Sequence, residues 1–505
     1  MDTLVSVTGE ISGFMYTYIL VFLLVFCAIY FTIRTKGVQI RYIKDMFTQL
    51  TEKRHVEGKK SISSFQALMV STASRVGTGN IAGIATAVAT GGPGAVFWMW
   101  LMALAGAASA FIESTLAQIW KVRGKEGEFR GGPAYYIEQA LGKRWLGVLF
   151  AILLIICYAY GFNGLQAFNM ASALEYYIPD YATNGAAMAL GIVLVVMTAF
   201  VIFGGSKRIS IITSIVVPVM ALAYIGLGIF ITLTNLDKLP EVFSVIAASA
   251  FDFQSIFGGF AGSVVVLGIK RGLFSNEAGM GSAPNAAATA SVSHPVKQGL
   301  VQTLSVYIDT LVVCTCSAFM VLIFYVQSGG TFGELNGMPL VQMAVNSAVG
   351  EMGIHFVTFA IFAFAFSSLI GNYFYAESNM RFIKNSPVVL TIFRVTVLIA
   401  IFVGCLNSFD LAWNLADITM GFMAIVNLIA ILLLGKWAFK ALDDYTAQKK
   451  AGKDPVFVAD NIEGLPKTEC WHIGSDDLKD VGPQPVKEYF EEAIDAGGDS
   501  FEPLK

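Results

Sequence analysis

Two short polar stretches rich in glycine interrupt long apolar runs of the chain. The first, Arg75–Gly83, reads RVGTGNIAG, and the second, Phe274–Ser282, reads FSNEAGMGS. Inside hydrocarbon every backbone N–H and C=O must be satisfied by the protein, so irregular backbone is tolerated there only where protein or an enclosed cavity surrounds it. The half-helices beside such a break present free N–H groups to a carboxylate and free carbonyls to an ammonium or sodium ion. Two matching breaks are typical of the ligand site of a secondary transporter.

The residues of both stretches are the first candidate ligands. Glycines let the backbone approach a bound molecule closely, and amide and hydroxyl side chains add polar groups. Glycines in membrane helices also serve close helix packing, which is the alternative interpretation. The amides and the carboxylate in the same stretches favour a binding site. The candidates for substrate binding are Gly77, Thr78, Gly79, Asn80, Phe274, Ser275, Asn276, Gly279 and Met280.

Ionisable residues within apolar runs are costly in hydrocarbon and are therefore functional candidates. Arg75 is a candidate for a gate or for an ion pair with a carboxylate that the sequence does not identify. Glu277 and Asp309 are candidates for a proton-carrying group, and Glu277 also for binding a substrate ammonium. A plain ion pair between helices is the alternative. Further ionisable candidates are Glu113, Lys270, Arg271 and Glu377, and Asp410, Asn414 and Asp417 share one face of the last predicted helix, which indicates an outer vestibule wall or a gate.

Composition and hydropathy indicate the elements that must position these residues. The chain is 55% hydrophobic and 14% charged, with a mean hydropathy of +0.65, whereas average soluble domains are about 25% charged. Its apolar runs recur at about the 20 residues that a helix needs to cross hydrocarbon. We predict an all-α integral membrane protein with 11 transmembrane helices, near residues 14–34, 63–89, 94–120, 146–176, 184–204, 208–234, 257–290, 299–327, 353–380, 386–406 and 410–438.

The distribution of Lys and Arg predicts the orientation of these helices. Basic residues recur in every second connecting segment, beginning with residues 34–60, and are almost absent from the segments between. Because cytoplasmic loops carry the excess of positive charge, we expect a multi-pass plasma-membrane protein with its N-terminus outside and its C-terminus in the cytosol. In the acidic tail, residues 441–505, Pro455–Val458 and the stretch around Trp471 are candidates for docking onto the membrane part. A passive, solvated tail is the alternative.

The ten predicted helices after the first form two groups of five, and each group opens with a glycine-interrupted helix. An odd number of spans gives the two groups opposite orientations in the membrane, which is the inverted-repeat arrangement. The predicted organisation is an N-terminal helix with a basic loop (1–62), a first repeat (63–234), an external connection (235–256), a second repeat (257–440) and the acidic tail (441–505).

Three motifs resemble the alanine/glycine:cation symporter family. They are Ser71–Trp100 (STASRVGTGNIAGIATAVATGGPGAVFWMW), Gly131–Gly142 (GGPAYYIEQALG) and Gly272–Ala290 (GLFSNEAGMGSAPNAAATA). That family is similar in turn to the leucine-transporter-like sodium symporters. The resemblance therefore implies a five-plus-five inverted-repeat core preceded by one helix, and transport without covalent chemistry.

The resemblance also implies roles for residues outside the two breaks. The helix that carries Tyr158–Asn169 would close one side of the substrate pocket, with Gln166 contacting the substrate and Phe162 and Phe168 bounding its side chain. A sodium site would lie between the first break and the motif FAFSSLIG, because hydroxyl and carbonyl oxygens suit a hard cation. Adjacent serines that bond to their own helix are the alternative. The implied oxygen ligands belong to Ala73, Val76, Phe364, Ser367 and Ser368.

We therefore expect a bilayer-embedded symporter that imports a small neutral amino acid, alanine or glycine, with inward movement of Na⁺ by alternating access. We expect no cofactor apart from the transported Na⁺, no nucleic-acid partner and no enzymatic activity. Three alternatives remain open at this point: a proton-coupled symporter, a cation channel whose filter uses the broken helices, and a membrane sensor with the tail as its output.

Overall fold

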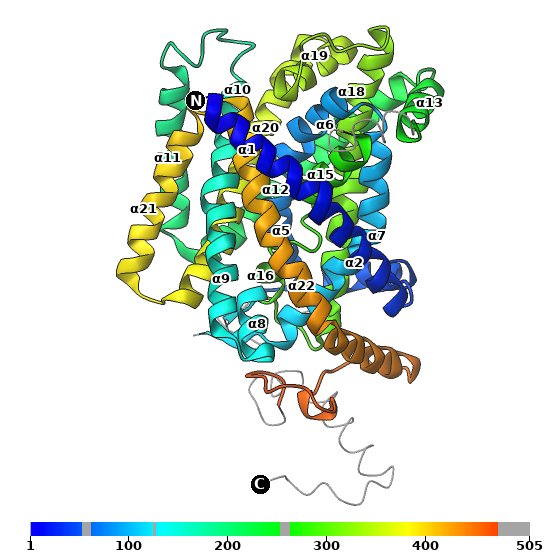
Figure 1. Ribbon diagram of the computed structural model, residues 1–505, viewed down its shortest axis with the longest axis vertical. Helices are drawn as coiled ribbons and strands as arrows, with labels where there is room; N and C mark the ends of the chain where they lie inside the picture. The colour runs from blue at the N-terminus through cyan, green and yellow to red at the C-terminus, as the bar shows by residue number, and fades with distance from the viewer. Residues whose placement is uncertain (1, 53–61, 125–127, 253–262, 473–505) are drawn as a thin grey trace, which may run out of the picture.

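Long apolar helices form most of the structure, a computed structural model that describes residues 2–52, 62–124, 128–252 and 263–472 (Figure 1). Some features used above therefore lie outside the described residues: the basic residues between 53 and 60, Lys125, the start of the predicted span at 257–262, and the tail after residue 472. Within the described residues, eight helical segments are long and apolar enough to cross a membrane. They are Thr3–Arg34, Ala95–Ile119, Arg144–Ser172, Lys207–Thr234, Pro295–Gln327, Glu351–Ile383, Pro387–Gly404 and Phe409–Lys450.

Several of these segments combine α-helical with π-helical turns. In chain order the elements are α1 (Asp2–Met15), η1 (Tyr16–Leu20), α2 (Val21–Arg34), α3 (Val38–Arg41), α4 (Ile43–Thr48), η2 (Gln49–Thr51), α5 (Ser64–Arg75), η3 (Gly79–Gly83), α6 (Ile84–Gly91), α7 (Ala95–Ile119), β1 (Val122–Arg123), β2 (Phe129–Arg130), α8 (Pro133–Leu141), α9 (Arg144–Leu154), η4 (Ile155–Phe162), α10 (Asn163–Ser172), α11 (Ala186–Ile202), α12 (Gly205–Thr234), α13 (Leu239–Ala250), α15 (Val264–Asn276), α16 (Pro284–Ala287), α17 (Pro295–Val306), η6 (Tyr307–Cys314), α18 (Thr315–Gln327), α19 (Gly337–Val349), α20 (Glu351–Ile383), α21 (Pro387–Gly404), α22 (Phe409–Lys450) and η7 (Ala459–Asn461).

The first glycine-rich stretch interrupts a helix, as the sequence predicts. α5 begins with a capping box, in which the Ser63 hydroxyl accepts from the Gln66 N–H and the Gln66 side chain accepts from the Ser63 N–H. It ends at Arg75, after which Val76 is extended with φ −77° and ψ 92°. Helical structure resumes at Gly79 with the π-helical η3 and continues into α6. A π-helical turn inside a helix often marks a functional site.

The second glycine-rich stretch ends α15 in the same way. Glu277 at the end of α15 has a left-handed conformation with φ 56°, which is uncommon for a residue that carries a Cβ. Gly279 and Gly281 follow with φ 86° and φ 85°, a region that glycine enters without steric cost. Irregular backbone then leads to the single short turn of α16. The break is therefore longer than the first.

Many of the described helices lie within the predicted spans, with differences at their ends, whereas α13 and α19 lie in none of them. The first helical segment begins at Asp2 instead of near residue 14, because its polar residues bond within the helix; the Thr8 hydroxyl, for example, donates to the Leu4 carbonyl at 2.8 Å. α22 continues to Lys450 instead of ending near 438, since no glycine or proline lies between residue 438 and Gly452. The count of 11 membrane spans and the inverted repeat stay predictions.

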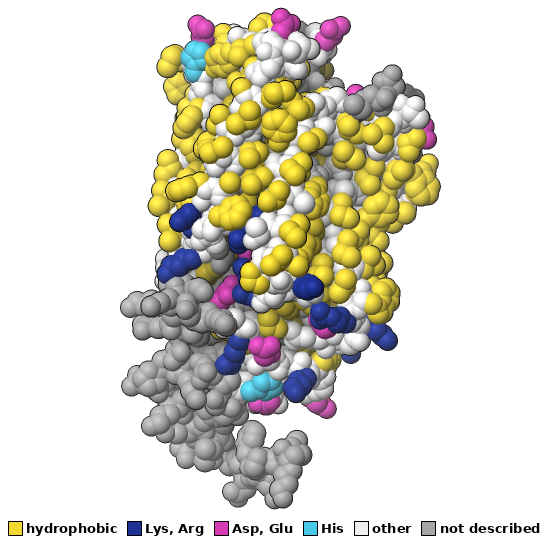
Figure 2. Space-filling model, turned by 90° about the vertical axis from the view of Figure 1, so that its left-hand side faces the viewer, with side chains coloured by type: hydrophobic (Ala, Val, Ile, Leu, Met, Phe, Trp, Pro, Cys, Tyr) yellow, Lys and Arg dark blue, Asp and Glu magenta, His cyan; other side chains and the backbone are white. Residues whose placement is uncertain are grey.

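Apolar side chains cover the middle of the molecule on the face shown in Figure 2, and Lys and Arg side chains gather toward its lower part. In Figure 1, α1 and α2 run alongside α22, and α11 and α21 lie together at one edge. The family motif Gly131–Gly142 forms α8 at the lower end, close to the C-terminal segment. α5, α15 and the short α16 lie inside this helical shell, so the surrounding helices enclose both breaks (Figure 1).

Candidate functional site

Side-chain amides from η3 and α10 bond to the backbone N–H groups of the first break. The Gly77 N–H donates to Asn80 Oδ1 at 3.0 Å, and the Thr78 N–H donates to Gln166 Oε1 of α10 at 3.1 Å. A side chain at residue 77 would overlap the Ser368 hydroxyl, so glycine is required for this approach. The Thr78 hydroxyl is buried and has no hydrogen-bond partner among the described residues. Gln166, assigned from the family resemblance, thus touches the first break.

Asn80 joins the two broken helices. Its side-chain amide donates to Asp309 Oδ1 at 2.6 Å and to the Ser275 hydroxyl at 3.0 Å. The Ser275 hydroxyl donates a short hydrogen bond to Asp309 Oδ2, which also accepts from the Thr310 hydroxyl at 3.0 Å. All four side chains are fully buried. The structure therefore brings together predicted residues from the first break, the second break and η6.

Within the second break, backbone N–H groups already have a protein partner. Gly279 N–H and Gly281 N–H donate to the two carboxylate oxygens of Glu113 on α7, at 3.2 and 3.0 Å. The Asn427 amide of α22 donates to Glu113 Oε2 and to the Gly279 carbonyl, both at 2.8 Å. Gly279 therefore lies on the side of α7 and α22, while Ser275 faces Asn80, and Met280 is fully buried.

Sequence reasoning did not find the role of Glu113 and missed Asn427. Glu113 was only one buried charge among several, and Asn427 lies in an apolar run without a neighbouring polar motif. The carboxylate of Glu113 acts as a cap for the broken backbone, since it satisfies two N–H groups that have no helical partner. Asn276, also a predicted ligand, instead accepts from the Ala278 N–H at 3.0 Å and donates to the Thr310 hydroxyl.

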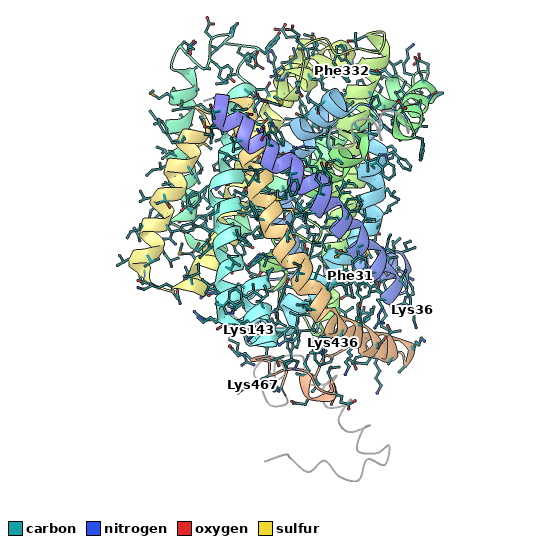
Figure 3. The ribbon with its side chains drawn as sticks, in the orientation of Figure 1. Phe31, Lys36, Lys143, Phe332, Lys436 and Lys467 are labelled. Carbon is teal, nitrogen blue, oxygen red and sulfur yellow. The ribbon has the colours of Figure 1, made fainter. Side chains whose placement is uncertain are left out.

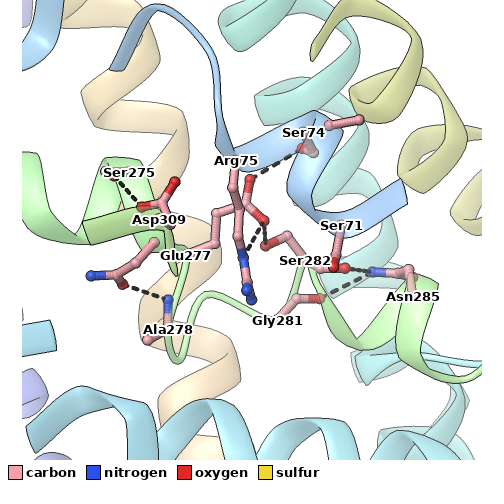
Figure 4. Close-up of polar contacts among 12 residues, drawn as sticks. Ser71, Ser74, Arg75, Ser275, Glu277, Ala278, Gly281, Ser282, Asn285 and Asp309 are labelled. Carbon is pink, nitrogen blue, oxygen red and sulfur yellow. Dashed lines mark hydrogen bonds and ion pairs between the residues drawn. The ribbon is translucent and has the colours of Figure 1, made fainter. Parts of the chain in front are cut away.

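Arg75 and Glu277 form an ion pair between the ends of α5 and α15 (Figure 4). The distance from Arg75 Nε to Glu277 Oε2 is 3.7 Å, and both side chains are at most 1% exposed. The Ser282 hydroxyl donates to Glu277 Oε2 at 2.8 Å, and the Ser74 hydroxyl donates to Oε1 at 3.1 Å. The three guanidinium nitrogens have no hydrogen-bond partner among the described residues. This pair identifies the carboxylate partner of Arg75 that the sequence left open.

Backbone and hydroxyl oxygens converge between the first break and α20. The Ser368 hydroxyl lies 2.9 Å from the Ala73 carbonyl oxygen, 3.0 Å from that of Phe364 and 3.4 Å from that of Val76. The Ser367 hydroxyl bonds only within its own helix, to the Phe364 carbonyl at 2.8 Å. The five atoms assigned from the family resemblance therefore lie together, with Ser368 at their centre. An oxygen set of this kind suits a hard monovalent cation.

Aromatic rings pack against the backbone of the first break. The Phe274 ring packs so closely on Gly79 that a Cβ there would overlap it, and the Phe162 ring lies 4.7 Å from the Phe274 ring centre. Phe168 lies farther along α10, where its ring centre lies 6.2 Å from that of Phe409. Phe162 and Phe274 thus bound the same space, while Phe168 belongs to a neighbouring aromatic group.

A second cluster of charges connects α15 with α22. Asp417 Oδ2 lies 2.7 Å from Arg271 Nη2 and 2.5 Å from Lys270 Nζ. The Arg271 guanidinium also lies 4.4 Å from the centre of the Trp413 ring, and the Trp413 ring lies 5.4 Å from that of Phe274. Three of the ionisable residues singled out in the sequence thus form one buried cluster, next to the aromatic rings over the first break.

Comparison with known proteins places this arrangement in a family. Residues 1–459 match the sodium:alanine symporter family. The chain is 48% identical to the amino-acid carrier protein AlsT of Bacillus subtilis (strain 168), over 91% of this chain and 96% of AlsT. It is 47% identical to the probable sodium/glutamine symporter GlnT of the same organism, over 92% of this chain and 96% of GlnT. It is 36% identical to the sodium/alanine symporter AgcS of Methanococcus maripaludis, over 85% of this chain and 94% of AgcS.

Among solved structures, the crystal structure of MhsT in complex with L-phenylalanine has a similar fold. The TM-score is 0.54 at 15% sequence identity, covering 76% of this chain and 96% of MhsT. At this sequence identity the likeness is one of fold alone. The chain therefore belongs to the sodium:alanine symporter family, whose members are amino-acid symporters of the membrane.

Proposed function

We propose that this chain imports a small neutral amino acid, alanine or glycine, together with Na⁺ by alternating access. The observation that carries the proposal is the contact of two interrupted helices through Asn80, with Ser275 and Asp309 on the other side. Such breaks leave backbone groups for a zwitterion and a cation at the centre of the protein. The name of AlsT supports amino-acid transport, and that of AgcS supports symport of sodium and alanine.

The substrate carboxylate binds at the first break. Glu113 occupies the N–H groups of Gly279 and Gly281, so a second carboxylate at that place would meet repulsion. At the first break, the N–H groups of Gly77 and Thr78 bond to neutral amide oxygens of Asn80 and Gln166, which a substrate carboxylate can replace without repulsion. The Thr78 hydroxyl there has no partner among the described residues. Because an unsatisfied buried hydroxyl costs about 1–3 kcal/mol, a substrate that bonds to it gains that energy.

A small side chain fits the aromatic boundary of this site. The rings of Phe162 and Phe274 lie 4.7 Å apart, and Phe274 packs directly on Gly79. Space for a long side chain would require Phe274 to move. Alanine and glycine therefore bind with less rearrangement than glutamine, the substrate in the name of GlnT.

Sodium binds among the oxygens around Ser368, and in doing so connects the first break to α20. The carbonyl oxygens of Ala73, Val76 and Phe364 and the Ser368 hydroxyl supply ligands without a net charge. A cation there fixes the position of Val76, which belongs to the break itself. Sodium binding therefore shapes the substrate site, which couples the two solutes. The Arg75–Glu277 pair and the Arg271–Asp417 cluster act as gates that open in turn.

Uptake of labelled alanine into proteoliposomes tests this function. We expect accumulation under an inward sodium gradient with equal pH on both sides, and competition by unlabelled glycine stronger than by glutamine. Accumulation driven only by a pH gradient would replace sodium with proton coupling, for which Asp309 and Glu277 are the candidate groups. Single-channel currents in sodium without amino acid would instead identify a channel.

A further inference from the structure

A cavity outside the transport site lies where the first membrane helix leaves the membrane. It has a volume of about 280 Å³ and lies between the end of α2, the turn into α3 and the last third of α22. One water molecule occupies roughly 30 Å³ in the liquid, so the cavity has room for a group of several heavy atoms. The residues that line it are Arg34, Thr35, Lys36, Arg41, Phe439, Leu442, Asp443, Thr446, Ala447 and Lys450.

The cavity carries a strong excess of positive charge. Four cationic side chains and one carboxylate line it, which leaves a net charge of +3. Among the described residues, no carboxylate oxygen lies within 4.0 Å of the side-chain nitrogens of Arg34, Lys36, Arg41 or Lys450. The neighbouring Lys449, by contrast, pairs with Asp45 at 2.9 Å. These four cationic side chains therefore lie close together without ion-pair partners among the described residues.

The backbone at the end of α2 brings these cations together. Gly37 N–H donates to the Thr32 carbonyl at 2.8 Å and Lys36 N–H to the Ile33 carbonyl at 3.1 Å, which is the Schellman arrangement of a helix C-terminus. Lys36 has φ 53° at the position where this turn normally contains glycine. The turn reverses the chain, so that Lys36 and Arg41 lie beside Arg34.

The Arg34 side chain is positioned by stacking. Its guanidinium carbon lies 5.0 Å from the centre of the Phe439 ring on α22, which is a cation–π contact. The Arg41 guanidinium lies 4.8 Å from the Tyr42 ring and donates to the Thr35 carbonyl at 3.5 Å. Both contacts leave guanidinium N–H groups for a ligand, and a guanidinium matches two oxygens of a phosphate at once.

Exposed apolar side chains lead from the cavity along the membrane helix. Ile33 is 69% exposed, Ile29 54% and Phe26 57%, all on α2, and Ile40 on α3 is 66% exposed. α2 ends at Arg34, so the cavity lies at the depth of lipid headgroups and these side chains at the depth of acyl chains. This holds for either orientation of the chain in the membrane.

We propose that this cavity binds the phosphate headgroup of an anionic phospholipid whose acyl chains lie along α2. Basic pockets between helices at the membrane surface suit anionic headgroups. Free inorganic phosphate has the same oxygen chemistry but makes no use of the apolar surface of Ile29 and Ile33. The occupant is therefore a lipid, and the site connects the first membrane helix to α22.

Native mass spectrometry of the full chain in detergent tests the proposal with phosphatidylglycerol, phosphatidylcholine and inorganic phosphate as probes. The cavity variant is Arg34→Gln/Lys36→Gly/Arg41→Gln. The matched control is Lys143→Gln/Lys384→Gln/Lys467→Gln, which removes the same charge from exposed positions; Figure 3 shows Lys143 and Lys467 apart from Lys36 at the same end of the molecule. Each cation near a headgroup contributes about fivefold in affinity, so the cavity variant should bind phosphatidylglycerol about 100-fold more weakly.

The control variant should retain phosphatidylglycerol like the parent chain, and phosphatidylcholine should bind all three proteins alike. Equal loss in both variants, or loss in neither, overturns the proposal. If phosphate adducts replace bound phosphatidylglycerol at millimolar phosphate, the proposal of a lipid is wrong and the cavity is a site for a free anion. If the triple variant lacks a thermal unfolding transition, the single variant Lys36→Gly replaces it in the test, because glycine suits the left-handed turn. Lys36→Gly should weaken phosphatidylglycerol binding about fivefold. Unchanged binding contradicts the proposal.

Discussion

At the scale of single residues, Gly79 sets the distance between the two broken helices. A Cβ at this position overlaps the Phe274 ring, so Gly79→Ala forces the ring away from the first break. Overpacking of this kind costs about 1–3 kcal/mol, and we expect alanine uptake to fall by about tenfold or more. Gly79→Ala/Phe274→Leu should recover part of the uptake. Gly226→Ala, where nothing lies within 4 Å of the added carbon, is the control and should transport normally.

The serine pair of α20 provides a matched comparison for the sodium site. The Ser368 hydroxyl bonds to carbonyls of α20, of α5 and of the first break, whereas the Ser367 hydroxyl bonds, among the described residues, to a carbonyl of α20 alone. Ser368→Ala should therefore raise the sodium concentration for half-maximal uptake by about tenfold, because it removes one of roughly six oxygen ligands. Ser367→Ala should change it much less. Equal effects of both substitutions on the sodium dependence would remove Ser368 from the cation site.

The sequence alone predicts the place of some residues of the site but not of others. Asn80 and Ser275 lie in motifs with unusual composition, so their contact follows from the two breaks. The partners Glu113 and Asn427 lie in otherwise apolar helices, and nothing in their local sequence indicates which backbone they satisfy. Such pairing depends on how helices far apart in the chain pack together, which a local pattern does not contain.

At the scale of elements, α7 supports the second break through Glu113. The two carboxylate oxygens of Glu113 each accept one glycine N–H, whereas a glutamine has one acceptor oxygen, so its NH₂ group faces the N–H of either Gly279 or Gly281. Glu113→Gln should lower the free energy of unfolding by about 1–3 kcal/mol, the cost of an unsatisfied buried donor. Thermal unfolding in detergent measures this. Glu138→Gln, which breaks only the exposed pair with Arg144, should have little effect.

The start of α17 contains a group that makes stability depend on pH. Burial lowers the pKa of His294, whose Nδ1 accepts from the Val296 N–H at 3.2 Å while Nε2 lies 3.1 Å from Asp444. A lowered pKa in the folded state means that the unfolded chain binds the proton more tightly, so stability is complete above the unfolded pKa of about 6.5 and decreases as pH falls below it.

This pH dependence has a specific structural origin that a substitution can test. Protonation of Nδ1 removes the acceptor for the Val296 N–H, which is the cap of α17. His294→Asn keeps an acceptor for that N–H but does not titrate. We expect the unfolding temperature of the parent chain to fall between pH 7 and pH 5 more steeply than that of His294→Asn. Parallel pH curves for the two proteins would contradict this role.

The helices themselves were largely predictable, because length and hydropathy define a membrane span without knowledge of its neighbours. The ends of the helices were harder to predict. The predicted start of the eighth span at residue 299 was late, since α17 begins at Pro295. Lys297, which precedes that predicted span in the sequence, lies on α17, is 1% exposed and pairs with Glu52 and Asp454. Its position depends on the tail that covers it.

At the scale of the whole molecule, the described part of the acidic tail packs against the membrane part. The Trp471 indole N–H donates to the Gln118 carbonyl at the end of α7 at 2.8 Å, and the Lys121 ammonium lies 4.2 Å from the Trp471 ring centre. The Phe457 N–H donates to the Ser293 carbonyl at 2.9 Å. Both predicted docking stretches therefore make contacts, and they connect α7 to the segment that precedes α17.

Trp471→Ala tests whether these contacts hold the tail as a unit. Trp471 is fully buried, so its truncation should cost the tail about 3–5 kcal/mol. The Phe457 N–H bonds to the Ser293 carbonyl and the Ala459 N–H to the carbonyl of residue 471, and both amides should then exchange hydrogen much faster. Amides of α7 and α20 should remain protected, because docked segments open locally before a protein unfolds. Trp145→Ala, at a tryptophan that is 67% exposed, should leave all of these rates unchanged. Faster exchange throughout the membrane helices would instead show that the tail and the membrane part unfold together.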